Sequence, residues 1–514
     1  MDNHSWQDLG PYTQLLNLEE MEFRPYQYSI INSIIAHGNT LVVLPTGLGK
    51  TLIGAALVAK AVYEEKRALF LAPTKPLTQQ HHTTLLHLLK LQANDIALLV
   101  GTTKKRERKE IEQKAKVIVA TPQTIANDLR SANFSLMGFG VAIFDECHHA
   151  VGKYAYTYIA NELAARNVLI VGLTASPGSK PERVMSLVES LNIRHIEART
   201  STDADVINYV MPKYMHTIRV DIGDTIRHIA ALIKPVGDES LKALRSMGLA
   251  NFKNVDAVPK GRLIELGDEI KKIKATGYRF GAFFNYVRLL HAEHVLDLVT
   301  TEGLYPFKAY LDSLDIRETK SRALQSFLRN ANVIEAKKLA EAAIAKGEEH
   351  PKVAMLLSIL NQYKNKSIIV FAQYRATVKM IVDKLRANAF KAKAFVGKKE
   401  GVTQEQQKQV IEEFRQGAFN VLVASSIGEE GLDIPSVDVV VFYEPIPNEI
   451  RNIQRRGRTG RFRAGDVYVL VAGNTKDEVY FFVSRSRERK MLSILNIVNE
   501  KLEARYPAYG QKRL

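Results

Sequence analysis

The sequence predicts an α/β fold in which two parallel-sheet domains are separated by an all-helical insertion domain. Short β-branched runs alternate with helix-like stretches over residues 40–173, and the same alternation returns over residues 367–471. Between about residues 211 and 350 a hydrophobic period of about 3.6 residues replaces it. Alternating strands and helices typically form a parallel sheet covered on both faces, whereas the longer period indicates helices that pack on one core.

Each sheet domain is predicted from its own set of strands. The first set is expected at residues 41–44, 68–71, 96–100, 117–120, 141–144 and 168–173, and the second at residues 367–371, 392–396, 420–424, 437–442 and 467–471. The insertion is expected to hold helices at residues 226–234, 239–246, 263–276 and 321–346, with turns at Pro235-Val236-Gly237 and Tyr305-Pro306. The predicted domains are residues 1–210, 211–350 and 351–495, followed by a tail at 496–514 that continues a helix begun after Arg485.

Composition limits the classes of protein and partner. The 514 residues are 46% hydrophobic, which is enough for several cores, and the net charge of +16 favours a polyanionic partner such as nucleic acid over general solubility. A single cysteine, Cys147, excludes an internal disulfide framework. No stretch approaches the ~20 apolar residues of a membrane span, and the first residues lack a secretory pattern. We therefore expect a soluble intracellular protein of the cytoplasm or nucleoid, with no membrane partner.

A phosphate-binding loop is predicted between the first strand and the next helix. Gly47 and Gly49 allow backbone N–H groups to turn towards phosphate oxygens, and Thr46 lies in the same loop. Lys50 can reach the terminal phosphates of ATP, and Thr51 can ligate Mg²⁺. Leu44 stands where the general pattern has its first glycine.

An acidic pair follows the fifth predicted strand. Asp145 is expected to hold Mg²⁺, and Glu146 is expected to polarise the water that attacks the γ-phosphate. Cys147 lacks a partner base and is predicted to be a packing residue, whereas His148 is expected to couple this site to the cleft between the domains. An exposed acidic turn is the simpler alternative for the pair.

Together these motifs resemble those of superfamily 2 helicases of the DEAH-like group. The resemblance rests on the phosphate loop, Asp-Glu-Cys-His at 145–148, Thr-Ala-Ser-Pro at 174–177 and Gln-Arg-Arg-Gly-Arg-Thr-Gly-Arg at 454–461. It covers nearly the whole chain and implies two RecA-like domains. The helical insertion makes the chain most similar to archaeal Hef and its Fanconi anaemia M-type relatives, which act on forked and branched DNA.

The resemblance implies further site residues. Gln27, in Phe-Arg-Pro-Tyr-Gln, would read adenine, and Gln454, Arg458 and Arg461 would act on the γ-phosphate from across the cleft. Gly431 and Asp433 would contact the nucleotide near its phosphates and ribose. The residues implied to grip one nucleic-acid strand are Lys75, Thr121, Thr124, Gln373 and Arg375.

The insertion carries basic residues next to aromatic ones. Lys271, Lys272 and Lys274 precede an aromatic-rich stretch at residues 278–284. We expect the lysines to contact DNA before the aromatics do, because aromatics in such a segment most often form the core.

The sequence therefore predicts an ATP- and Mg²⁺-dependent DNA helicase or translocase that acts on forked or branched DNA without reading sequence. The resemblance implies movement from 3′ to 5′. We expect a monomer that works with a nuclease, either separate or fused. Alternatives are a double-stranded RNA-dependent ATPase of the Dicer or innate-sensor type and a scaffold without turnover; the presence of Lys50 and Glu146 argues against the scaffold.

Overall fold

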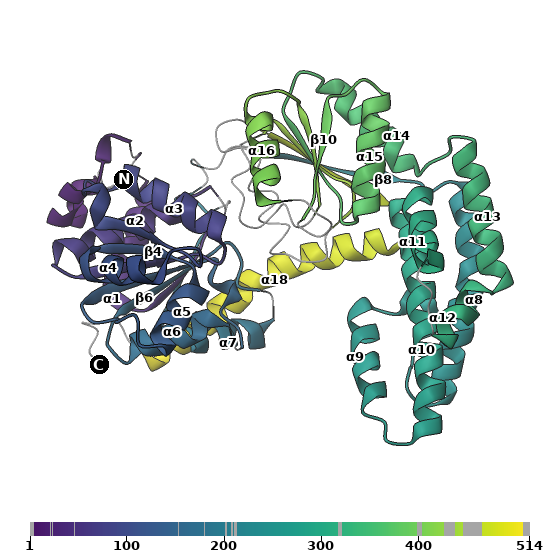
Figure 1. The fold of residues 1–514 in the computed structure, drawn as a ribbon, viewed down its shortest axis with the longest axis horizontal. Coiled ribbons are helices and arrows are strands. Elements are labelled where there is room, and N and C mark those ends of the chain that lie inside the picture. Colours follow the sequence, from purple (N-terminus) through teal and green to yellow (C-terminus); the bar gives the residue numbers. More distant parts are fainter. Residues whose placement is uncertain are drawn as a thin grey trace.

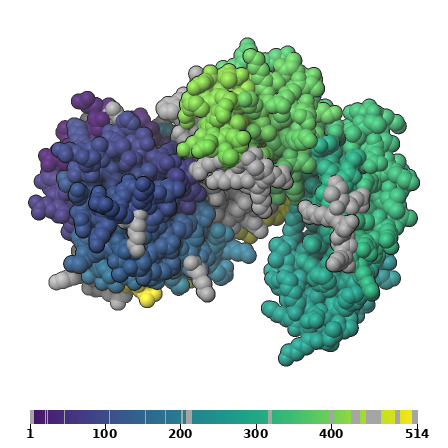
Figure 2. All heavy atoms as spheres, in the orientation of Figure 1, coloured from purple at the N-terminus to yellow at the C-terminus, as the bar shows by residue number. Residues whose placement is uncertain are grey.

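The computed structural model describes most of the chain. The described residues are 5–20, 22, 24–45, 47–152, 154–178, 180–200, 203–206, 209, 213–316, 321–397, 403–425, 437–445 and 465–506. Two parallel sheets lie side by side, and a helical segment projects from the second one, away from the first (Figures 1 and 2). The predicted fold class is confirmed.

The first sheet has seven strands in the order β3-β4-β2-β5-β6-β1-β7. They are β1 (Thr40–Val43), β2 (Arg67–Leu71), β3 (Ile96–Leu99), β4 (Val117–Ala120), β5 (Phe139–Asp145), β6 (Leu169–Thr174) and β7 (His195–Ala198). The helices are α1 (Pro25–His37), α2 (Lys50–Tyr63), α3 (Lys75–Leu88), α4 (Lys105–Lys114), α5 (Pro122–Arg130), α6 (Ala155–Ala164) and α7 (Pro181–Ser190). Strand β7 lies at the edge of the sheet and was not predicted.

The faces of this sheet bury two separate cores because side chains alternate along each strand. On β1, Leu41 and Val43 pack with α5, α6 and α7, whereas Val42 and Leu44 pack with α1, α2 and α3. The first of these cores also contains apolar residues from the C-terminal helix α18 (Lys476–Arg505).

The second sheet has six strands in the order β10-β11-β9-β12-β13-β8. They are β8 (Lys213–Val220), β9 (Ile368–Phe371), β10 (Ala392–Phe395), β11 (Val421–Ala424), β12 (Val439–Phe442) and β13 (Gly465–Ala472). Helices α14 (Pro351–Gln362) and α15 (Arg375–Ala387) pack on one face, and α16 (Gln404–Arg415) packs on the other.

Several expectations for the insertion need correction. The helix expected over residues 263–276 ends at Lys271, and the helix expected over residues 321–346 is interrupted at Arg329 and Asn330. Residues 213–220 were predicted within the all-helical insertion, but they form β8, which pairs in parallel with β13 along its whole length. Pro235 was expected at a turn between helices, yet α8 (Asp224–Ser246) passes through it. Both ends of α8 bury apolar residues in one core, and this packing outweighs the backbone hydrogen bond that the proline removes.

The remaining helices of the insertion complete that core. They are α9 (Lys260–Lys271), α10 (Thr276–Asp297), α11 (Leu304–Ile316), α12 (Arg322–Leu328) and α13 (Ala331–Ala345), with one π-helical turn, η8 (Leu298–Glu302), after α10. Among the described residues, no helix is both long enough and apolar enough to cross a bilayer.

Candidate ATPase site

The phosphate loop is built by the turn from β1 into α2. Gly47 and Gly49 adopt φ angles of +88° and +76°, which side chains with a Cβ rarely adopt. Gly49 caps α2, so the loop leads directly into the helix N-terminus, where unpaired N–H groups favour phosphate. The ammonium group of Lys50 donates to the carbonyls of Leu44 (2.9 Å) and Pro45 (3.4 Å), and therefore folds back over the loop.

Gln27 supports this loop from α1. Its Nε2 donates to the carbonyl of Leu48 over 3.1 Å, and the hydroxyl of the neighbouring Tyr26 donates to the same carbonyl over 2.8 Å. A Cβ at Gly49 would lie 2.2 Å from Gln27 Nε2, so only glycine fits there. Gln27 is 2% exposed, and its Oε1 is buried without a hydrogen-bond partner among the described residues. An acceptor oriented in this way is suited to an amino group such as that of adenine.

Asp145 ends β5 and has two partners that the sequence did not reveal. Nε2 of His81, from α3, lies 2.7 Å from Asp145 Oδ2, and both side chains are buried. The hydroxyl of Tyr156, from α6, donates to the Asp145 carbonyl over 2.7 Å. These contacts fix the direction of the carboxylate. The partners lie on helices distant in sequence, and no local pattern marks either of them.

Glu146 has a strained backbone and a strongly acidic side chain. Its φ and ψ of +46° and +45° place it in the left-handed region, which costs a non-glycine residue energy and is typical of functional sites. Burial would raise the pKa of Glu146, but the His148 ring and the charge of Lys50 lower it to about 2. Because β1 and β5 both pair in parallel with β6, Glu146 and the phosphate loop lie at the same edge of the sheet. Glu146 is therefore ionised at neutral pH.

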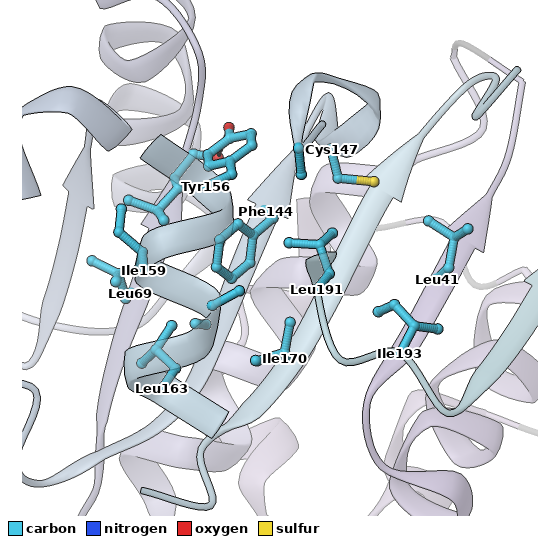
Figure 3. Packing of buried hydrophobic residues seen from close by; sticks show 14 of the residues in the cluster. Leu41, Leu69, Phe144, Cys147, Tyr156, Ile159, Leu163, Ile170, Leu191 and Ile193 are labelled. Atoms are coloured by element: carbon cyan, nitrogen blue, oxygen red, sulfur yellow. Dashed lines mark hydrogen bonds between the residues drawn. The ribbon is translucent and has the colours of Figure 1, made fainter. Parts of the chain in front are cut away.

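The next residues connect this site to the end of β6. Nδ1 of His148 lies 3.3 Å from Glu146 Oε2 and 3.1 Å from Thr174 Oγ1, so it bridges the acidic pair and the Thr-Ala-Ser-Pro segment. Cys147 points into the apolar core beside Phe144 and Leu191 (Figure 3). Burial raises the pKa of its thiol, which agrees with a packing role.

The predicted strand-gripping residues of the two sheet domains lie at helix starts. Thr121 and Thr124 begin α5; both are buried, and their hydroxyls lie 2.8 Å apart in a hydrogen bond with each other. Lys75 opens α3 and donates to Thr102 Oγ1 over 3.2 Å. In the second domain Gln373 is exposed, whereas Arg375 opens α15 and donates to the Gly397 carbonyl over 3.0 Å.

The tip of the insertion differs from the expectation for its aromatic residues. Phe280 and Phe283, on the first turns of α10, are 61% and 45% exposed rather than part of the core. Lys271, Lys272 and Lys274 are also exposed, and Lys271 pairs with Asp268 over 2.9 Å. The helical core lies along the rest of α10, so basic and aromatic side chains share one exposed tip.

Several predicted site residues lie outside the described residues. They are Thr46, Gly431, Asp433, Gln454, Arg458 and Arg461. The second-domain side of the ATP site is therefore predicted from sequence alone.

Comparison with known proteins places this site in a family. Residues 20–179 match the family model "Type III restriction enzyme, res subunit", and residues 351–463 match "Helicase conserved C-terminal domain". The structure also matches the crystal structure of the Pyrococcus furiosus Hef helicase domain with a TM-score of 0.71 and 39% identity, over 92% of this chain and 100% of that one. The chain belongs to the Hef-type superfamily 2 helicases. This is a family of ATP-dependent helicases, as the resemblance implied.

The names of two further relatives of this Hef-type chain specify different nucleic acids, RNA in one case and DNA in the other. A Methanocaldococcus jannaschii protein, named provisionally as an ATP-dependent RNA helicase, is 36% identical over 95% of this chain. The Neurospora crassa ATP-dependent DNA helicase mph1 is 32% identical over 89% of it. This chain spans 63% of the first relative and 41% of the second.

Proposed function

We propose that this Hef-type chain hydrolyses ATP to move along DNA from 3′ to 5′, and that it acts on forked or branched DNA without reading sequence. The observation that carries the proposal is that β1 and β5 both pair in parallel with β6, because this brings the phosphate loop after β1 and Glu146 after β5 to the same edge of one sheet. In this role Lys50 leaves the loop carbonyls to bind phosphate, and Glu146 accepts a proton from the attacking water.

Nucleotide and metal would be held by residues around this pair. Gly47, Gly49 and Lys50 would bind the phosphates, and Gln27 would bind adenine through its unpartnered Oε1. Thr51 and Asp145 would hold Mg²⁺, which neutralises phosphate charge when it is bound. A buried carboxylate fixed by His81 fits a hard cation, since carboxylate and hydroxyl oxygens are the ligands it prefers. In the undescribed part of the second domain, Gln454, Arg458 and Arg461 would act on the γ-phosphate, and Gly431 and Asp433 would bind the nucleotide.

The nucleic acid would run across both sheet domains to the tip of the insertion. Lys75, Gln373 and Arg375 would contact the backbone of one strand, as would the starts of α5 at Thr121 and Thr124. At the tip, Lys271, Lys272 and Lys274 would bind phosphates of the duplex. The exposed Phe280 and Phe283 support a further contact, because an aromatic ring can stack on an unpaired base at a junction.

A second candidate is an RNA-dependent ATPase or translocase. It is favoured by the names of two relatives, the Methanocaldococcus jannaschii protein and the Arabidopsis thaliana RNA helicase FANCM, which is 30% identical over 89% of this chain. The two candidates share the ATP site and differ in the polymer that stimulates it.

The experiment is an ATPase measurement on the purified chain with forked DNA, single-stranded DNA and double-stranded RNA at matched nucleotide concentrations and at two salt concentrations. We expect the fork to stimulate most, and Glu146→Gln to lower the stimulated kcat at least ~100-fold while ATP binding persists. Greatest stimulation by duplex RNA would favour the second candidate. Full activity of Glu146→Gln would remove the role given to Glu146.

A further inference from the structure

Helix α18 joins the two sheet domains. It starts directly after β13 of the second sheet, and its C-terminal half packs on the first domain. Thirty residues of α-helix span about 45 Å, and Figure 1 shows α18 running from the base of the insertion to the underside of the first domain. The helix is therefore placed to carry displacement between the domains.

The N-terminal end of α18 is fixed to the second domain and the insertion. Lys352, which is fully buried in α14, donates to Asp477 Oδ2 over 2.5 Å. Lys476 pairs with Glu293 of α10, and Arg219 of β8 pairs with Glu478. Breaking a buried ion pair of this kind is costly, so this end moves with the second domain.

The C-terminal half is fixed to the first domain by an apolar stripe and by several polar contacts. Met491, Leu495, Val498 and Leu502 recur every three or four residues, and all are buried in the core that holds α5, α6 and α7. Asn499 Oδ1 accepts a hydrogen bond from the backbone N–H of Ile196 over 2.7 Å. Because Ile196 lies on the edge strand β7, the helix satisfies an N–H that no further strand covers.

One residue of that stripe also reaches the ATPase site. The buried hydroxyl of Ser176 donates to Met491 Sδ over 3.0 Å. The Ser176 backbone N–H donates to Thr174 Oγ1 over 3.1 Å, and Nδ1 of His148 lies 3.1 Å from the same oxygen. His148 then contacts Glu146, so polar contacts link α18 to the predicted base, with the covalent frame of Ser176 joining its hydroxyl to its backbone N–H.

We propose that Met491 is a positioning residue for Glu146. It acts through Ser176, Thr174 and His148, and it makes the rate of hydrolysis depend on where the second domain holds α18. Leu495, Val498 and Leu502 supply the packing, whereas Met491 alone of the four offers an acceptor to Ser176. The inference rests on the role proposed for Glu146.

The test must separate the polar link between Met491 and Glu146 from the packing of Met491. We measure steady-state ATPase kinetics with forked DNA. The variants are M491L, S176A, the double variant S176A/M491L and the control L495M. Leucine keeps the volume of methionine but removes the acceptor, and L495M changes the same stripe away from the polar contacts. The double variant replaces both partners by apolar groups, so its thermal midpoint should stay near that of the wild type.

We expect M491L and S176A each to lower kcat by about 3–10-fold with little change in the KM for ATP, and the double variant to fall no further. L495M should behave as the wild type. A wild-type kcat for M491L, or additive losses in the double variant, would overturn the proposal. Glu146→Gln is measured in parallel. If Glu146→Gln kept its activity, the role proposed for Glu146 would be wrong. If Glu146→Gln were inactive while M491L kept a wild-type kcat, only the proposed link through Met491 would be refuted.

Discussion

At the scale of single residues, the candidate site consists of groups whose neighbours determine their state. Lys50 is folded onto loop carbonyls, Glu146 is held ionised in a strained conformation, and Asp145 is fixed by His81. The sequence predicted the phosphate loop and the acidic pair from local order and residue type. It could not identify His81 or Met491, since each reaches the site through tertiary packing from a different helix.

Gly49 provides the first residue-scale prediction. Gly49→Ala must place a Cβ 2.2 Å from Gln27 Nε2 at a φ of +76°, so the loop or Gln27 has to move. We expect kcat/KM for ATP to fall by about tenfold or more in an ATPase assay, since such strain costs roughly 1–3 kcal/mol. Gly261→Ala, at an open position on α9, is the control, and equal activity of the two alanine variants would contradict this account of the loop.

At the scale of elements, most strand positions followed from hydrophobic runs, but strands β7 and β8 and the course of helix α8 did not. Strands β7 and β8 both lie at sheet edges, where one side of the strand has no neighbour and the sequence need not be uniformly apolar. β8 also carries several polar residues and precedes the helical period of the insertion. Pro235 indicated a turn, yet tertiary packing kept α8 continuous. In each case contacts distant in sequence outweighed the local signal.

The π-helical turn η8 provides a prediction about pH. Glu302 is 1% exposed and accepts a hydrogen bond from Thr377 over 2.8 Å. Burial raises its pKa to about 7, although Lys352 and Thr377 act in the opposite direction. A raised carboxyl pKa means that ionisation destabilises the folded state: the cost is absent below the unfolded pKa, near 4.5, grows as the pH rises towards the folded pKa of about 7, and is constant above it.

Glu302→Gln should therefore raise the free energy of unfolding more at pH 8 than at pH 5, by a difference on the order of 1 kcal/mol, because glutamine keeps an acceptor for Thr377 without the charge. Thermal midpoints measured at the two pH values test this. Glu348→Gln is a matched control, since the exposed Glu348 accepts a hydrogen bond from Thr225 over 2.8 Å. Its effect should not vary with pH in this way. A Glu302→Gln midpoint shift that was the same at both pH values would show that ionisation of Glu302 does not limit stability.

At the scale of the whole molecule, two sheet domains and an insertion are joined by buried contacts of α18. The insertion and the second sheet share buried ion pairs at the start of α18, and the far half of α18 is packed into the first domain. The tip, where α9 leads into α10, lies at the end of the insertion far from the second sheet (Figure 1). On our proposal, movement of the second domain would move this tip relative to the strand held by the first domain.

The most direct test of the central claim is strand displacement with ATP on forked DNA and on duplexes that carry only a 3′ or only a 5′ single-stranded tail. Our account predicts that the fork and the 3′-tailed duplex are unwound, that the 5′-tailed duplex is not, and that Glu146→Gln unwinds none of them. Replacing both Phe280 and Phe283 by alanine should slow unwinding of the fork more than ATP hydrolysis, since base stacking at a junction contributes roughly 1–3 kcal/mol per base. Failure to unwind any of these DNAs, together with an ATPase that responds only to duplex RNA, would contradict the account.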